Sequence, residues 1–550
     1  MKVPVQWISF VPGTPARGYW DQTILEDLFA GRFFIPEAFD VEHVDRMEPI
    51  PSTATPILVV PGAKHAEGSG FEQLIAYVSR FDRALVVLSS DEGSLLDPRR
   101  LVSERVRVWT QNARPDHRAE GVRSYPVGYS PLTREVRNVH SGQKPLDWFF
   151  AGQITHERRA RCAEALHTVP NGELIGTDGF LKGVPPREYL NKLAGAKIAP
   201  CPGGVITPDT FRICEALELG CVPLVDPRPG GAPIPGYWQN LFGSSPLPFV
   251  EDWAQAPELI ARLLADWTTV HQRVAAWWLE YKRRLARDLR RDVAWLTGRF
   301  AASEGQRLSV VVPTSPIASH PDTSIIDATL KSVMERPDLE HAEILVMSDG
   351  VRKKQSHYEA RYSAYRTELL HKARLSDRIV VRLFEEHQHQ AAMTRVMLGD
   401  VDRPAILFLE HDAPLVNEIP FEKLITAVCA EADLVRLHHE THVLEAHAHL
   451  MLDAESRDVD GLPLRRTVQW SQRPHVANTG FYRRILEAHF APEERFMIED
   501  RMYGVVENAW IQHGLAGWYH YRLYMYAPAG NILRSLHADG RGADPKWVDE

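Results

Sequence analysis

Short apolar runs alternate with amphipathic stretches along the first half of the chain. Four of the runs are rich in β-branched and aromatic residues and end at Gly, Pro, Ser or Asn, at residues 5–11, 56–62, 84–90 and 106–111. Stretches with helical periodicity, such as residues 71–81, separate some of them. This pattern predicts an open parallel sheet with helices on its faces.

A second series of the same kind follows. Strands are expected at residues 146–152, 172–177, 197–204 and 221–227, with an Arg-rich helix after the first and helices on either side of the third. A long helical region, roughly residues 252–298, comes next. Two successive Rossmann-like lobes are therefore expected, residues 1–140 and 141–300, with a ligand cleft between them.

A small, polar stretch at residues 299–307 precedes a fresh strand that begins at Leu308. Beyond it, strand patterns at residues 308–316, 342–350 and 405–414 are joined by helical ones. We place the main domain boundary at this stretch and expect one α/β domain over residues 308–550. The whole chain is thus expected to be α/β, with two Rossmann-like lobes followed by a single domain of different fold.

Composition narrows the class of protein. No stretch approaches the roughly 18 uninterrupted apolar residues of a membrane helix, and the N-terminus lacks the pattern of a signal peptide. The five cysteines are odd in number and show no C-x-x-C spacing, so a reduced, cytoplasmic protein without a membrane span is expected.

The net charge of −9 argues against broad capture of nucleic acid. The Arg-rich run 281–292 is the main basic patch; a solvated helix face is favoured there over a nucleic-acid groove.

A glycine-containing loop follows the third strand of the second lobe. Gly203 and Gly204 let the backbone approach a ligand closely. Thr210, or Asp209 beside it, is placed to cap the next helix. Because a helix N-terminus attracts a diphosphate through its unpaired N–H groups, the loop is a candidate site for a nucleotide donor.

The helix after this loop carries Arg212 and Glu215 one turn apart. Arg212 would add a bidentate cation for phosphate oxygens, and Glu215 would accept hydrogen bonds from ribose hydroxyls; the alternative is a surface ion pair at i,i+3 spacing. With Phe-Ala-Gly at 150–152 and the segment 210–225, these residues resemble the C-terminal lobe of exostosin-like (GT47-like) GT-B glycosyltransferases, over about residues 146–226. The resemblance implies that Arg212 and Glu215 grip a nucleoside diphosphate sugar.

The strand expected at 405–409 runs directly into Glu410-His411-Asp412. Divalent ions such as Mg²⁺ and Mn²⁺ prefer carboxylate oxygens, and a short acidic motif at the end of a buried strand delivers them. The motif therefore predicts a metal site; an acidic turn without a ligand is the alternative.

The order of motifs over residues 308–505 resembles the GT2-like family of GT-A glycosyltransferases. The resemblance implies donor contacts from Pro313, Asp349 and Arg395, with Ser348 in place of the family's first acid. It also implies a Mn²⁺ or Mg²⁺ ion held by Glu410 and Asp412, of which Asp412 is the firmer ligand because Glu410-His411-Asp412 replaces the usual D-x-D.

Downstream segments extend the resemblance. Residues 478–481 look like the family's acceptor-side segment, and Glu499-Asp500 like its E-D pair. This implies Asp500 as the base of an inverting displacement and Glu499 as a contact of the acceptor hydroxyl, against an ordinary helix-capping role. Several GT-A enzymes use a C-terminal His as a further metal ligand; His537 is expected to do so, a plain surface histidine being the alternative.

Five further histidines invite a metal assignment: His438, His439, His442, His447 and His449. Their spacing fits no closed four-ligand site and no cysteine accompanies them, so no zinc site is expected.

The sequence therefore predicts a bifunctional glycosyltransferase that takes sugars from nucleotide-sugar donors to a glycan or glycoconjugate acceptor. Two alternatives stay open. One is a glycosyltransferase that acts on hydroxymethylated bases of nucleic acid. The other is a protein with one active module and one decayed module that only binds.

Overall fold

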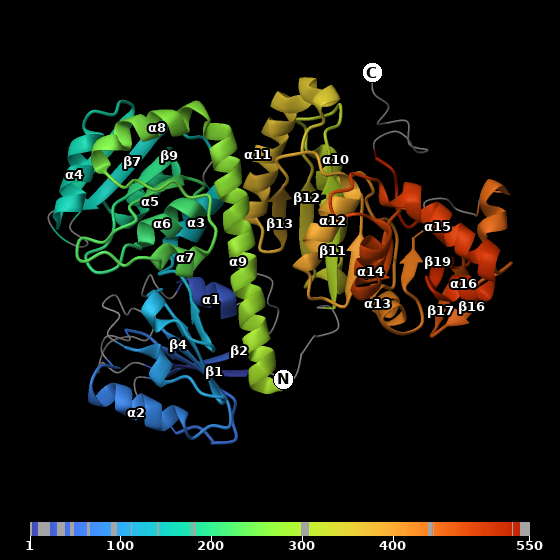
Figure 1. Ribbon diagram of the computed structural model, residues 1–550, viewed down its shortest axis with the longest axis horizontal. Helices are drawn as coiled ribbons and strands as arrows, with labels where there is room; N and C mark the ends of the chain where they lie inside the picture. Colours follow the sequence, from blue (N-terminus) through green and yellow to red (C-terminus); the bar gives the residue numbers. More distant parts are fainter. Residues whose placement is uncertain are drawn as a thin grey trace. The chain divides into compact units, whose positions relative to one another are not determined.

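The computed structural model describes residues 3–8, 23–29, 39–44, 49–62, 66–89, 96–111, 113–139, 142–177, 179, 183–298, 307–437, 443, 445–530 and 532–538. The chain divides into two compact units, Met1–Ala301 and Ala302–Glu550, which we call the N-terminal and C-terminal units (Figure 1). Among the described helices, none combines the length and apolar character needed to cross a membrane.

The first lobe of the N-terminal unit is a parallel sheet in the order β2-β1-β3-β4-β5-β6. Its strands are β1 (Val3–Ile8), β2 (Phe39–Val44), β3 (Ile57–Val60), β4 (Ala84–Leu88), β5 (Val106–Thr110) and β6 (Val122–Ser124). The helix α2 (Ser69–Val78) covers one face and α1 (Thr23–Phe29) belongs to the core on the other. Because both faces are buried, the central strands are continuous apolar runs.

The second lobe is a smaller parallel sheet in the order β10-β9-β7-β8. Its strands are β7 (Leu146–Gln153), β8 (Gly172–Thr177), β9 (Ala196–Cys201) and β10 (Val222–Val225). Its helices are α4 (Glu157–Leu166), α5 (Pro186–Ala194), α6 (Phe211–Glu218), α7 (Tyr237–Phe242) and α8 (Ala256–Ala265), and α3 (Leu132–Val139) leads in from the first lobe. One core lies under α4 and α8, and the other is shared with the first lobe.

The long helix α9 (Trp267–Thr297) ties the two lobes together. It packs against α1 and β4 of the first lobe and against α6, α8 and β10 of the second (Figure 1). A buried ion pair between Lys282 and Glu218, 2.7 Å apart, fixes it to α6. The helical region expected from residue 252 is thus two helices, because α8 ends at Ala265 and α9 begins at Trp267.

The C-terminal unit is built on a mixed sheet in the order β13-β12-β11-β14-β18-β15-β19-β17-β16. The parallel strands are β11 (Leu308–Thr314), β12 (Glu343–Ser348), β13 (Ile379–Leu383) and β14 (Ala405–Phe408). The others are β15 (Leu434–Arg436), β16 (Arg457–Val459), β17 (Leu462–Arg466), β18 (His475–Asn478) and β19 (Leu523–Tyr526). The antiparallel strand β18 separates β14 from β15.

The helices of this unit are α10 (Ser324–Met334), α11 (Glu359–Leu375), α12 (His389–Gly399), α13 (Phe421–Ala430), α14 (Thr479–His489), α15 (Ile498–His513) and α16 (Leu515–Tyr519). The predicted α/β class is confirmed, with two parallel sheets and one mixed sheet. The cysteines are free; Cys429 is exposed and the other four are buried.

Candidate active site

The parallel strands β11, β12 and β14 bring their carboxyl ends to one edge of the C-terminal sheet. Pro313 is a buried residue of β11, beside Met347 of β12. Asp349 follows β12 directly, and Glu410 lies just beyond the end of β14. Motifs that are far apart in the sequence therefore meet at the edge where ligands of open α/β sheets bind.

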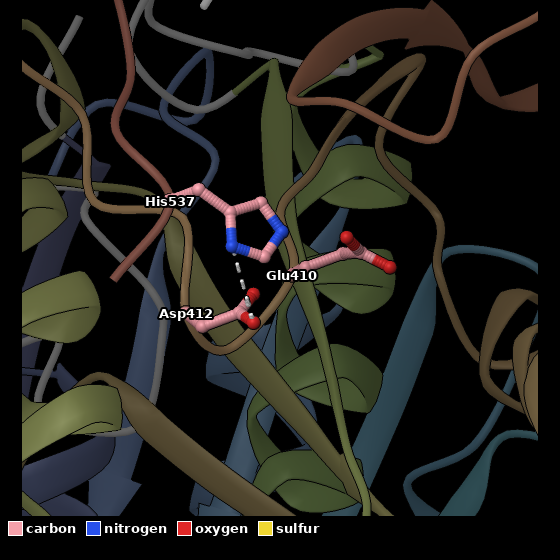
Figure 2. Close-up of side chains that lie close together, drawn as sticks. All are labelled: Glu410, Asp412 and His537. Carbon is pink, nitrogen blue, oxygen red and sulfur yellow. Dashed lines mark ion pairs between the residues drawn. The ribbon is translucent and has the colours of Figure 1, made fainter. Parts of the chain in front are cut away.

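Three potential metal ligands converge there. Ligand atoms of Glu410, Asp412 and His537 all lie within 4.8 Å of one another. The Nδ1 atom of His537 is 3.8 Å from Oδ2 of Asp412, and Figure 2 shows both side chains turned toward each other beside Glu410. Asp412 is 2% exposed, whereas Glu410 and His537 are half-buried. Two carboxylates and an imidazole form a donor set that suits Mn²⁺.

Main-chain hydrogen bonds position His537. The segment 533–538 runs antiparallel to residues 412–416, with N–H of Val416 donating to Arg534 and N–H of Leu536 to Pro414. The last bond of this series joins N–H of Ala538 to the carbonyl of Asp412 at 2.7 Å. A residue more than 120 positions downstream in the sequence is thereby held beside the strand-end motif.

The carboxylate of Asp349 is engaged inside the protein. It accepts hydrogen bonds from N–H groups of Gly350, Gln388 and His389 at 2.8, 2.7 and 3.1 Å. Nδ1 of His387 lies 2.7 Å away as a fourth partner. These contacts occupy the acceptor capacity of the carboxylate. Asp349 thus holds the loop before α12, and the nucleoside contact implied by resemblance stays a prediction.

Arg395 is likewise used within the protein. Its guanidinium donates to the carbonyls of Leu486 and Phe490 at the end of α14. Arg483 of α14 reciprocates by donating to carbonyls of Leu398 and Val401 at the end of α12. Each arginine thus satisfies terminal carbonyls of the other helix, and the expected donor contact from Arg395 finds no support in this geometry.

Glu499 and Asp500 begin α15 in different environments. Glu499 is half-buried, and the N–H of Gln472 and the hydroxyl of Ser471 act to lower the pKa of its carboxyl. Burial raises the pKa of Glu499 above its ordinary value, and the charge of Asp500 adds to the rise. Asp500 is exposed. A buried carboxylate with a raised pKa suits a general base, so Glu499 joins Asp500, the base expected from the sequence, as a candidate for that role.

Tyr482 links Glu499 to the metal-ligand cluster. Burial, together with the charges of Glu410 and Glu499, raises the pKa of its phenol. Nδ1 of His475 bonds the carbonyl of Arg473 at 2.7 Å, so its Nε2 can accept from the Tyr482 hydroxyl at 3.3 Å. The charges of both carboxylates therefore act on one buried phenol.

His389 was not singled out from the sequence. It starts α12 with φ of 63°, a left-handed conformation that is uncommon for residues other than glycine. Its Nδ1 accepts the N–H of Gln390 at 2.9 Å, which leaves the proton on Nε2. Burial lowers the pKa of His389, and the charge of Asp500 acts in the opposite direction without cancelling this effect. Strained residues of this kind cluster at functional sites.

The expected acceptor-side segment caps a helix. The side chain of Asn478 accepts the N–H of Phe481 at 2.9 Å and so caps α14. Of the five further histidines, His438, His439 and His442 lie outside the described residues, and His447 and His449 lie in a short 3₁₀ helix, Glu445–Leu450. Among the described residues, these histidines contribute to no metal-ligand group.

In the N-terminal unit, the glycine loop is packed against neighbouring backbone. A Cβ on Gly203 would lie 2.3 Å from the carbonyl oxygen of Arg228, and one on Gly204 would lie 2.6 Å from that of Thr207. The carbonyl of Gly203 also accepts a hydrogen bond from Nε of Arg159 at 3.2 Å. Glycine is therefore required at both positions.

Two arginines meet beside this loop. Arg212 donates to the carbonyl of Ala151, and its guanidinium lies 4.5 Å from the ring centre of Phe150. Burial and the charge of Arg212 lower the pKa of Arg159 to about 10. Within ion-pair distance, neither arginine has a carboxylate among the described residues. Two like charges held together in this way favour an anion. Arg159 had been visible in the sequence only as part of an Arg-rich helix.

Glu215 and Thr210 differ from expectation. Glu215 is 4% exposed and accepts hydrogen bonds from Tyr189 at 3.0 Å and from N–H of Ser130 at 3.4 Å. It therefore forms neither the surface ion pair with Arg212 nor a ready ribose contact. Thr210 occupies the N-cap position of α6, but its hydroxyl makes no capping hydrogen bond. Asp209 instead accepts the hydroxyl of Tyr237 at 2.8 Å.

Comparisons with known proteins do not identify a family for this chain. No protein-family model matches the sequence, and no curated protein matches it. Solved structures similar to part of the chain include S. aureus TarS 1–349, with 15% identity over 42% of this chain and 61% of that one and a TM-score of 0.29. GalNAc-T7 with UDP, GalNAc and Mn²⁺ shows 12% identity over 42% of each chain and a TM-score of 0.28. The mannosyltransferase PcManGT from Pyrobaculum calidifontis, in complex with GDP-Man and Mn²⁺, shows 12% identity over 40% of this chain and 57% of that one, with a TM-score of 0.26. The chain thus spans less than two thirds of these proteins, and TM-scores this low decide nothing about its function.

Proposed function

We propose that the C-terminal unit is a divalent-metal-dependent glycosyltransferase that uses a nucleotide-sugar donor and inverts the anomeric configuration. The observation that carries this proposal is the convergence of Glu410, Asp412 and His537 at the carboxyl edge of the parallel strands. These residues would hold Mn²⁺ or Mg²⁺, which would neutralise the charge of the leaving diphosphate. The GT-A-like fold expected from the sequence is part of this proposal.

The proton of the acceptor hydroxyl goes to Glu499. As that proton leaves, the acceptor oxygen forms a bond to the anomeric carbon, and the bond to the nucleoside diphosphate breaks on the opposite face. The raised pKa of Glu499 suits it to accept this proton. His389 and Asp500 supply a donor and an acceptor for hydroxyls of the sugar or the acceptor.

The N-terminal unit contributes a second, metal-independent site for a nucleoside diphosphate sugar in a GT-B-like arrangement. Support comes from Arg159 and Arg212 beside the glycine loop and from the adjacent start of α6. The chain is then bifunctional, with a glycan or glycoconjugate as acceptor.

The full-length protein tests this with a panel of UDP- and GDP-sugars. Donor hydrolysis and binding are measured with Mn²⁺ and with EDTA. At least one donor should be hydrolysed with Mn²⁺, and Asp412→Asn should abolish this hydrolysis. Asp377→Asn, an exposed aspartate of the same unit, serves as the matched control. Absence of Mn²⁺-dependent hydrolysis and binding for every donor, or undiminished turnover in EDTA, contradicts the proposal.

A further inference from the structure

The Arg-rich run 281–292 does not form a continuous basic surface. Lys282 is buried and pairs with Glu218 at 2.7 Å, and buried Arg283 pairs with Glu280 at 3.4 Å. Arg284 and Asp288 instead line a cavity on the side of α9 that meets the first lobe. The run is therefore divided: Lys282 and Arg283 lie in the interior, Arg284 lines the cavity, and Arg291 is exposed.

The cavity has a volume of about 980 Å³, within the range of small-molecule sites. Its walls come from β5 and the edge strand β6 of the first lobe and from α7 and α9. The helix α7 separates it from the glycine loop. Tyr237 at the start of α7 bonds Asp209 on the loop side, whereas Asn240 and Leu241 near its end line the cavity. It is therefore distinct from the nucleotide-sugar site proposed above.

A buried carboxylate organises the floor of the cavity. Asp292 accepts hydrogen bonds from Arg107 at 2.5 Å, from Arg123 at 2.7 Å and from the indole of Trp109 at 2.8 Å. The side chain of Asp292 is 1% exposed, but those of Arg107 and Arg123 are 31% and 38% exposed. The guanidinium groups of Arg107 and Arg123 thus cover the carboxylate of Asp292. A ligand in the cavity would contact these cations rather than the carboxylate.

Arg284 adds a third guanidinium. It lies 4.9 Å from the ring centre of Tyr281 and donates to the carbonyl of Phe242 at 3.2 Å. Within the described part of the chain it has no carboxylate at ion-pair distance. The carboxylate of Asp288, which also faces the cavity, is shared at 3.7 Å by Arg123 and Arg291. Two further carboxylates, Glu104 and Glu120, stand on exposed loops at the rim.

We propose that this cavity binds a small phosphate anion, either a phosphate ester or a diphosphate, of the size of a sugar phosphate or a mononucleotide. Arg107 and Arg123 are oriented by Asp292 before any ligand arrives, and Arg284 lines the same cavity. Preorganised guanidinium groups of this kind bind phosphate oxygens through charge-assisted hydrogen bonds. Because both lobes supply the residues, an occupied site would also join the edge of the first sheet to α9.

The test is calorimetric titration of the full-length protein in EDTA with pyrophosphate, glucose 1-phosphate, AMP, glucose and a single-stranded DNA octamer. An Arg212→Ala background removes the other anion site of this unit. Arg284→Gln removes the charge while keeping a donor for the carbonyl of Phe242. Arg262→Gln, on the exposed face of α8, is the matched control.

We expect pyrophosphate to bind in the Arg212→Ala background, and Arg284→Gln to weaken it by about tenfold or more, the scale of one charge-assisted hydrogen bond. Arg262→Gln should leave the affinity unchanged, and glucose should not bind. Glucose 1-phosphate against AMP then distinguishes a sugar phosphate from a nucleotide. The proposal is overturned if Arg284→Gln binds pyrophosphate as well as its parent, if none of the three phosphate compounds binds, or if the octamer binds more tightly than all of them.

Discussion

Replacing Glu499 by Gln is expected to remove most of the turnover while leaving donor binding and folding intact. Gln keeps the shape of the Glu499 side chain and removes its basicity, so folding and donor binding should be kept. A positioned general base contributes about 10²- to 10⁴-fold to the rate, which corresponds to roughly 3–5 kcal/mol of transition-state stabilisation. The kcat for transfer should fall by that factor, with KM for the donor changing little.

The pH dependence of the wild type gives a second readout. Burial raises the pKa of Glu499 above the ordinary 4.5. As pH falls through that raised pKa, the base takes up a proton and the rate is lost, so the acid limb of kcat/KM should have its midpoint above 4.5. The acid limb should be absent from the residual activity of Glu499→Gln.

Asp500→Asn is the matched comparison, since Asp500 is the neighbouring carboxylate but is exposed. We expect it to keep turnover within about tenfold of the wild type, because it contacts hydroxyls rather than receiving the proton. An inactive Asp500→Asn beside an active Glu499→Gln would refute this assignment and restore the one expected from the sequence. A product that retains the anomeric configuration of the donor would refute the single displacement itself.

Three further predictions concern other parts of the chain. In EDTA, Arg212→Ala should weaken donor binding by the N-terminal unit by about 10- to 100-fold, whereas Arg262→Gln should have no effect. If calorimetry gives the two variants equal affinities for the donor, Arg212 has only a structural role. Burial lowers the pKa of His475 from 6.5 to about 4. As pH falls from 6.5 to about 4, the unfolded state takes up a proton at this histidine before the folded state does, and about 3 kcal/mol of the free energy of unfolding is lost. Hydrogen exchange at residues 475–478, corrected for intrinsic rates, should lose protection over this window in the wild type and not in His475→Gln; parallel pH profiles would contradict it. His389→Gly relieves about 1 kcal/mol of backbone strain but adds about as much unfolded-state entropy, so Tm should stay within a few degrees while turnover falls about tenfold; full activity would leave the strained backbone without a functional role.

The strand-end motifs can be predicted from the sequence because each apolar run and the residue that ends it are adjacent in the chain. Apolar runs that end in Pro313, Asp349 and Glu410 predict parallel strands, and the carboxyl ends of such strands meet at one edge. The edge strands β2 and β6 were not expected, because FDVEHV and VRS carry little apolar pattern. The antiparallel half of the C-terminal sheet was also missed, since strands as short as β15 and β16 give weak periodicity.

Roles within the site depend on distant partners and could not be read from spacing. Asp349 follows its strand as expected, but a loop some 40 residues later occupies its carboxylate. Glu499 and Asp500 are indistinguishable in the sequence, and the contacts from Ser471 and Gln472 separate them. The left-handed backbone of His389 leaves no trace in composition. His537 was expected from resemblance alone, because nothing local shows that its segment pairs with residues 412–416.

The central claim is that Glu410, Asp412 and His537 hold the divalent ion that the C-terminal unit uses. Electron paramagnetic resonance of Mn²⁺, titrated into the full-length protein with the donor identified in the panel, measures this directly. We predict one Mn²⁺ site that Asp412→Asn weakens by at least about 100-fold, that His537→Ala weakens by about 10-fold or more, and that Asp377→Asn leaves unchanged. Mn²⁺ binding by Asp412→Asn with the affinity of the wild type would contradict the account.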